Sequence, residues 1–290
     1  MWQNIRSVAR IGPQADERGG YSPSRLALKL ATSSTTDYDN TVYEHAPQGP
    51  KRKILMVCTE EREMTMRNGK KFSTGNHPVE MLVPMLHLEK AGFHIGIVTP
   101  TGRPVAIEMW AMPDQDPAVQ DIYDRYRDAF ANPDSLSDFA STLQAHQDIA
   151  AVFIPGGHGA MLGLPENEDL QRVIRWTLEE DLFMLSICHG PAALLAENLG
   201  ESQTSFAYRG YSMAVFPDRT DKITPLVGYM PGHMPWFFGE RLTELGVNIV
   251  NSQANGTCHR DRRLITGDSP NAANEFGKMA AQALLSESGA

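Results

Sequence analysis

The chain has 290 residues, of which 41% are hydrophobic and 21% charged, as is ordinary for a folded globular protein of one or two domains. Its formal net charge is −9 and it has no long basic run, which argues against nucleic acid as a main partner. No apolar stretch approaches the length of a membrane span, so we expect no membrane association. Three cysteines favour a reducing cytoplasm over a disulfide framework.

The first part of the chain, 1–49, carries the clusters Gly19-Gly20, Ser22-Pro23 and Ser33-Ser34-Thr35-Thr36 and shows little hydrophobic periodicity. We therefore predict an N-terminal extension that is only partly ordered. The range 50–290 alternates between apolar runs and amphipathic segments, and we assign it to a single domain. A less regular stretch around 103–148 is predicted to form a small inserted lobe.

Strands are predicted where the chain is continuously apolar, as in central parallel strands covered on both faces: 54–58, 95–99, 150–154 and 182–187. Further strands are predicted at 211–216 and 247–250, and helices at 78–91, 114–132, 168–180, 236–245 and 270–285. Asn255-Gly256 predicts a tight hairpin turn into a more polar strand that ends at Thr266 and lies at a sheet edge. The repeated β-α units predict an α/β fold with a doubly wound, mostly parallel sheet.

Cys188 directly follows the apolar run 182–187 and precedes the small residue Gly190. This pattern is typical of a nucleophile elbow, in which a buried strand turns sharply into a helix and presents a thiol. The positive end of that helix would favour the thiolate form. The alternative, a cysteine that simply packs in the core, does not explain the small residues around the bend.

A nucleophilic thiol needs groups that move protons, and the sequence offers candidates near the elbow. His189 is adjacent, and a carboxylate would fix its tautomer; the residues leave Asp218 and Asp221 open for that role. Glu80, in the first turn of a predicted helix, is either a partner of the helix dipole or a proton-transferring group facing the thiol.

Gly156 and Gly157 follow the strand 150–154, at the same carboxyl edge of the predicted sheet as Cys188. Their backbone N–H groups are candidates to bind an oxyanion and the substrate. A phosphate-binding loop is the rival interpretation, but no Lys-Ser or Lys-Thr pair follows these glycines.

Several segments together resemble the PfpI/ThiJ (DJ-1-like) superfamily, within the branch of bacterial heat-shock glyoxalase III enzymes and holding chaperones. The resemblance covers roughly residue 50 to the C-terminus and rests on 72–78, 110–113, 153–160, 188–193, 228–233 and 264–270. It implies a flavodoxin-like sandwich, an additional small lobe, a cytoplasmic location and usually a homodimer.

The resemblance also implies an activity, carried by a catalytic domain at 50–290. It implies a triad of Cys188, His189 and Asp221 with Glu80 as a further catalytic residue. The implied reaction is glutathione-independent conversion of methylglyoxal, a small 2-oxoaldehyde, to lactate through a cysteine hemithioacetal, without a cofactor. Deglycation of glycated proteins and ATP-independent holding of unfolded proteins are implied as further activities.

The branch can carry a metal site of two histidines and one glutamate, and here this sequence departs from it. The matching positions hold Glu89, His94 and Tyr126, which is a poor zinc site by ligand count, so we expect no tightly held metal. His87 lies near in sequence, at a spacing that need not face the same cavity.

Two other functions stay open at this stage. The same triad could cleave amides, as in a cysteine peptidase or amidase, which would need an open groove for a chain. A chaperone whose main role is holding unfolded proteins would instead work through exposed apolar surface.

Overall fold

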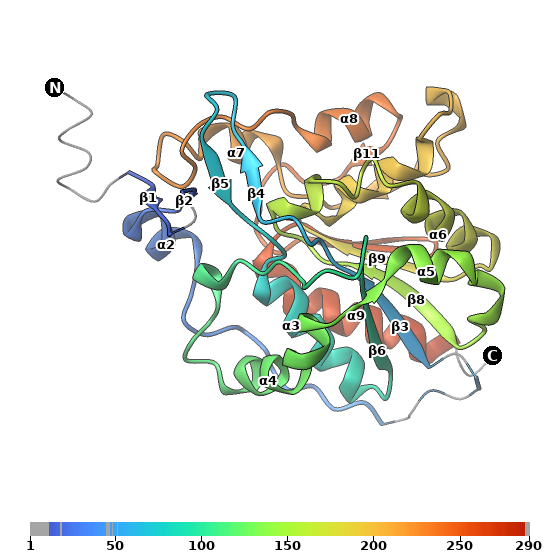
Figure 1. Cartoon of the computed structure of the whole chain (residues 1–290). Helices are drawn as coiled ribbons and strands as arrows, with labels where there is room; N and C mark the ends of the chain where they lie inside the picture. Colours follow the sequence, from blue (N-terminus) through green and yellow to red (C-terminus); the bar gives the residue numbers. More distant parts are fainter. Residues whose placement is uncertain (1–11, 18, 45–46, 48, 51, 288–290) are drawn as a thin grey trace, which may run out of the picture.

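The computed structural model describes residues 12–17, 19–44, 47, 49–50 and 52–287. A seven-stranded sheet lies at its centre, in the order β12-β13-β9-β8-β3-β6-β7 (Figure 1). Only the β12–β13 pair in this sheet is antiparallel. The strands are β3 (Lys53–Val57), β6 (His94–Thr99), β7 (Asp134–Ser135), β8 (Ile149–Ile154), β9 (Phe183–Ile187), β12 (Cys258–Asp261) and β13 (Leu264–Gly267).

Helices cover both faces of this sheet and bury two hydrophobic clusters against it. One cluster includes residues of α3 (Pro78–Lys90), α4 (Pro117–Ala131) and α9 (Ala273–Glu287). The other includes residues of α5 (Leu136–Ser141), α6 (Glu168–Glu179) and the 3-10 helix η4 (Gly190–Asn198). β8 and β9 are buried along their whole length because both of their faces are covered. The predicted α/β fold with a mostly parallel sheet is confirmed.

The described part of 1–49 lies against the rest of the molecule (Figure 1). β1 (Gln14–Ala15) and β2 (Tyr21–Ser22) join β5 (Lys71–Ser73) and β4 (Glu63–Thr65) in a second, four-stranded sheet. Ser24 caps the short helix α2 (Arg25–Ala31) by accepting a hydrogen bond from the Ala27 N–H. Farther along, Asp39 forms an ion pair with Lys278 of α9.

The stretch 103–148 is divided between the two faces and the edge of the main sheet. Its helix α4 packs on α3, its helix α5 packs on α6, and β7 pairs with β6. Among the residues that the structure describes, every helix is too short or too polar to cross a lipid bilayer.

The hairpin predicted at Asn255-Gly256 is wrong. The turn of the β12–β13 hairpin lies at Arg262 and Arg263, and Arg262 takes a φ of +56°. The backbone N–H groups of Asn255 and Gly256 instead donate to the Asp268 carboxylate. As a consequence β13 is an inner strand, completely buried beside β9, and β12 is the edge.

The strands predicted at 211–216 and 247–250 are shorter than expected and lie outside the main sheet. They are β10 (Ser212–Met213) and β11 (Asn248–Ile249), which form a two-stranded parallel sheet. The helix predicted at 236–245 is α8 (Phe238–Glu244), and α7 (Asp218–Ile223) precedes it. α7 carries both acids that the sequence left open as triad members.

Candidate active site

The chain makes a strained bend at Cys188, between β9 and η4. Cys188 has a φ of +60°, a left-handed conformation that non-glycine residues rarely adopt. Its N–H donates to the Gly267 carbonyl at 2.8 Å, and its carbonyl accepts from the Phe216 N–H at 3.0 Å. A Cβ on Gly190 would lie 2.5 Å from the Ile154 carbonyl oxygen, so a larger residue does not fit there. The predicted elbow geometry is present.

His189 connects the thiol to a buried carboxylate. Its Nδ1 lies 3.2 Å from Cys188 Sγ, and its Nε2 lies 2.9 Å from Asp221 Oδ2. Because the carboxylate accepts the Nε2 proton, Nδ1 of the neutral ring is free to accept the thiol proton. Burial and the neighbouring His158 lower the pKa of His189 to about 4, so the ring is neutral at rest.

The structure distinguishes between the two acids of α7. Asp218 accepts hydrogen bonds from the N–H groups of Gly239 and Glu240, which makes it a cap for helix α8. Asp221 is buried and faces the histidines. Burial acts to raise the pKa of Asp221, but His189 and His158 outweigh it and the net pKa lies well below the ordinary value.

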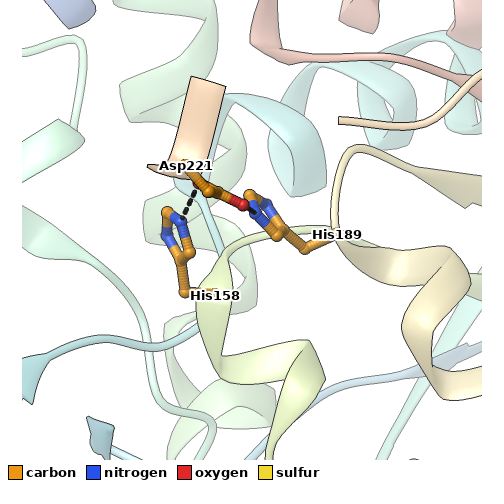
Figure 2. Close-up of side chains that lie close together, drawn as sticks. All are labelled: His158, His189 and Asp221. Atoms are coloured by element: carbon orange, nitrogen blue, oxygen red, sulfur yellow. Dashed lines mark hydrogen bonds and ion pairs between the residues drawn. The ribbon is translucent and has the colours of Figure 1, made fainter. Parts of the chain in front are cut away.

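A second imidazole, which the sequence did not single out, shares the same carboxylate. His158 Nε2 donates to Asp221 Oδ1 at 3.1 Å, so Asp221 lies between two histidines (Figure 2). The rings of His158 and His189 are 4.0 Å apart between centroids. Burial acts to lower the pKa of His158, but Asp221 and Glu108 raise it above the ordinary value.

Glu80 and the glycine pair meet at the thiol. A Cβ on Gly156 would lie 2.2 Å from Glu80 Oε2 and 2.7 Å from Cys188 Cβ, so only glycine allows this approach. Burial raises the pKa values of the thiol and of the Glu80 carboxyl, and the Gly157 N–H acts against this on both groups, as a donor placed for an oxyanion would. Gly157 itself has a φ of +96°.

Burial opposes the thiolate that the sequence pattern predicts. Cys188 is only 4% exposed, and this burial raises the pKa of the thiol well above its ordinary value. Burial likewise raises the pKa of Glu80. Both shifts favour a neutral thiol beside a protonated carboxyl, and His189 is the group placed to remove the thiol proton.

These groups line a cavity of about 280 Å³. Glu108 and Tyr229 also line it, and burial raises the pKa of Glu108 to about 7. Four buried side-chain atoms of the cavity make no hydrogen bond of ordinary geometry: His77 Nδ1, both Glu80 oxygens and Glu108 Oε2. Because buried polar atoms are nearly always paired, a cluster of unpaired ones indicates a place prepared for a polar ligand.

The outer part of the cavity is apolar and comes partly from the N-terminal extension. Ala27, Leu30 and Ala31 of α2 line it together with Ile223 and Val227. Leu30 is 75% exposed and Ile223 53%. The sequence carried no signal for this role of α2, because its contacts join residues far apart in the chain.

The candidate metal ligands lie elsewhere. Glu89 accepts a hydrogen bond from the Tyr126 hydroxyl at 2.7 Å and pairs with Arg125 at 2.7 Å, while His94 is exposed at the start of β6. Both ring nitrogens of the neighbouring His87 are bonded, to Tyr43 and Asn274. Within the described ranges, the only close group of three metal-binding side chains is His158, His189 and Asp221, whose facing atoms already bond to one another.

The chain is similar to known proteins over most of its length. Over 275 residues the chain is 46% identical to "Protein/nucleic acid deglycase HchA" of Escherichia coli O1:K1 / APEC, covering 94% of this chain and 95% of that protein. "Protein/nucleic acid deglycase 1" of Escherichia coli (strain K12) is 45% identical over the same shares. The crystal structure of glyoxalase III from Candida albicans has the same fold, with a TM-score of 0.62 and 23% identity over 80% of this chain and 98% of that one. The model of the DJ-1/PfpI family matches residues 72–283, and the chain therefore belongs to the DJ-1/PfpI family.

Proposed function

We propose that this protein is a glutathione-independent glyoxalase that converts methylglyoxal to lactate, and that it also removes early glyoxal adducts from proteins. The observation that carries the proposal is the strained, buried Cys188 with His189 on one side and Glu80 on the other, where burial favours the neutral form of both partners. The relatives named deglycases, which share 45–46% identity over 94% of the chain, support the same chemistry.

The first step is addition of the thiol to the aldehyde. His189 Nδ1 takes the thiol proton, and Asp221 stabilises the imidazolium that forms. As sulfur bonds to the aldehyde carbon, Glu80 gives its proton to the aldehyde oxygen, which the Gly157 N–H also meets. The product is a hemithioacetal beside a Glu80 carboxylate.

The second step moves hydrogen between the two carbons. The Glu80 carboxylate takes the proton from the former aldehyde carbon, the C–H electron pair becomes a carbon–carbon double bond, and the ketone oxygen gains a proton, which gives an enediol. Glu80 then returns its proton to the neighbouring carbon while the hydroxyl on the sulfur-bearing carbon loses one, which leaves a thioester. Oxidation of one carbon balances reduction of the other, so no redox partner takes part.

Water completes the reaction. Glu80 takes a proton from the water that attacks the thioester carbon, and the imidazolium of His189 returns its proton to the leaving sulfur. Every protein group then has the proton with which it began, and the net change is methylglyoxal plus water to lactic acid.

The cavity argues against a peptidase or amidase. A polypeptide substrate needs an open groove beside the nucleophile, whereas Cys188 is 4% exposed and lines a cavity of about 280 Å³. A small aldehyde, or an adduct on the tip of a long side chain, fits this volume better.

The apolar outer part of the cavity supports a second candidate function, the holding of unfolded proteins. Five of the large exposed apolar side chains belong to α2 or to α7 and the residues just after it: Leu26, Leu30, Ile223, Leu226 and Val227. Exposed apolar clusters of this kind favour contact with apolar protein segments.

One experiment separates these functions. Lactate formation from methylglyoxal without glutathione, and suppression of aggregation of a heat-denatured model protein, are measured on wild type and Cys188→Ala. We expect the variant to lose lactate formation and to retain holding. Undiminished lactate formation by the variant contradicts the assignment of Cys188.

We further propose a homodimer in the cytoplasm. The three cysteines, Cys58, Cys188 and Cys258, are all free thiols, which suits a reducing compartment. Sedimentation analysis tests the dimer.

Because the names of the relatives also mention nucleic acid, adducts on nucleotides belong in the substrate panel beside adducts on proteins.

A further inference from the structure

The proposed reaction leaves one proton transfer without a partner. When the enediol forms, the ketone oxygen of the substrate gains a proton, and when the thioester forms, the hydroxyl on the sulfur-bearing carbon loses one. Glu80 is occupied with the carbon-bound proton in both steps, and His189 holds the thiol proton. A second acid–base group has to reach the substrate oxygens.

Glu108 is placed for this task. Its side chain is buried and lines the same cavity as Cys188 and Glu80. Its Oε1 accepts a hydrogen bond from Thr74 Oγ1 at 2.7 Å, and the backbone N–H groups of His158 and Gly75 also face the carboxyl. Its Oε2 makes no hydrogen bond of ordinary geometry, so it has capacity for a hydrogen bond with a ligand.

The surroundings suit a group that gives and takes a proton near neutral pH. His158 Nδ1 lies 4.0 Å from Glu108 Oε1, and Glu80 and Tyr229 are its other titratable neighbours. Burial raises the pKa of Glu108 to about 7, against the opposing effect of His158. General acids and bases work best when their pKa is close to the operating pH.

We propose that Glu108 is a further catalytic residue, which donates a proton to the ketone oxygen of the bound substrate and takes one back from the neighbouring hydroxyl. This inference rests on the proposed glyoxalase function and extends it.

The protons and electrons balance. As Glu80 removes the carbon-bound proton, the C–H pair forms the carbon–carbon double bond, the carbonyl π pair moves to the ketone oxygen, and the Glu108 proton is transferred to that oxygen. When Glu80 protonates the second carbon, the other hydroxyl loses its proton to the Glu108 carboxylate and becomes the thioester carbonyl. Glu108 ends protonated, as it began.

The test compares wild type, Glu108→Gln and a matched control, Glu197→Gln. Glu197 is also buried and hydrogen-bonded, but it lies outside the cavity. Two quantities are measured: lactate formation, and the amount of Cys188-bound substrate adduct detected by native mass spectrometry of the intact protein. We expect Glu108→Gln to lower kcat by about 10²- to 10⁴-fold while the adduct accumulates. The control should retain wild-type turnover.

A second variant tests the proposal if Glu108→Gln does not fold. Thr74→Val removes the hydrogen bond that orients Glu108, and we expect a smaller fall in kcat with the adduct retained. Wild-type turnover in Glu108→Gln overturns the proposal, and so does loss of adduct formation along with turnover, because Glu108 would then support the site only structurally. If wild type itself makes no lactate, the proposed function fails, and the role of Glu108 falls with it.

Discussion

Replacing Asp221 with Asn tests how the buried carboxylate supports His189. The carboxylate accepts one N–H from His189 and one from His158, at 2.9 and 3.1 Å. An amide can accept only one of them and presents a donor to the other ring. Where the amide donates to His189, the ring proton moves to Nδ1, which then faces Cys188 as a donor and is unable to accept the thiol proton.

The expected loss of reaction rate follows from the ion pair between Asp221 and His189 that forms during thiol addition. Two unit charges 2.9 Å apart at an effective dielectric constant of about 20 attract by about 6 kcal/mol, which corresponds to about 10⁴-fold in rate. The analogous replacement in serine proteases lowers kcat by about the same factor. We expect Asp221→Asn to reduce lactate formation by about 10³- to 10⁴-fold and to slow alkylation of Cys188 by iodoacetamide.

Asp218→Asn is the matched control. Asp218 lies on the same helix but binds only backbone N–H groups of α8, so we expect near-normal turnover and a modest loss of stability. Asp221→Asn with more than about a tenth of wild-type turnover, an activation loss of less than about 1.4 kcal/mol, would refute the reasoning.

Three further predictions concern the cavity. Gly156→Ala places a Cβ 2.2 Å from Glu80 Oε2, so we expect lactate formation to fall by at least about tenfold. Gly12→Ala is the control, because a Cβ at Gly12 has no atom within 4 Å, and we expect it to leave lactate formation unchanged. The pKa of Glu108 is raised from 4.5 to about 7, so the folded protein holds an extra proton between these pH values, and the free energy of unfolding decreases as pH rises through this window. Urea unfolding of wild type should show this decrease, by up to about 3 kcal/mol from Glu108. Glu108→Gln should show a smaller decrease, because Glu80 keeps its own raised pKa. Equal pH dependence of the two proteins contradicts the assigned environment. Leu30 is 75% exposed, so Leu30→Ser should change the free energy of unfolding by less than about 0.5 kcal/mol. It should raise KM for protein-borne adducts more than KM for methylglyoxal. Unchanged KM values for both substrates would show that α2 does not contact the substrate.

The sequence was sufficient for features that depend on neighbouring residues. The apolar runs predicted the inner strands because both faces of a central parallel strand are covered, and the small residues around Cys188 predicted the elbow because the bend leaves no room for side chains. One turn that was predicted from local sequence was wrong. Asn255-Gly256 is a strong hairpin signal, but here its N–H groups bind Asp268, and Arg262 takes the left-handed conformation of the turn.

Contacts between distant residues were decided only by the tertiary structure. The residues around Asp218 and Asp221 do not distinguish their roles. The packing of α7 directs Asp218 toward the backbone of α8 and Asp221 toward the histidines. His158, Glu108 and α2 gave no local signal, since they approach Cys188 only when separate segments fold together. The ionisation of the site also depends on the tertiary structure. The elbow pattern favours a thiolate, whereas burial of Cys188 favours the neutral thiol, because a buried charge loses its hydration.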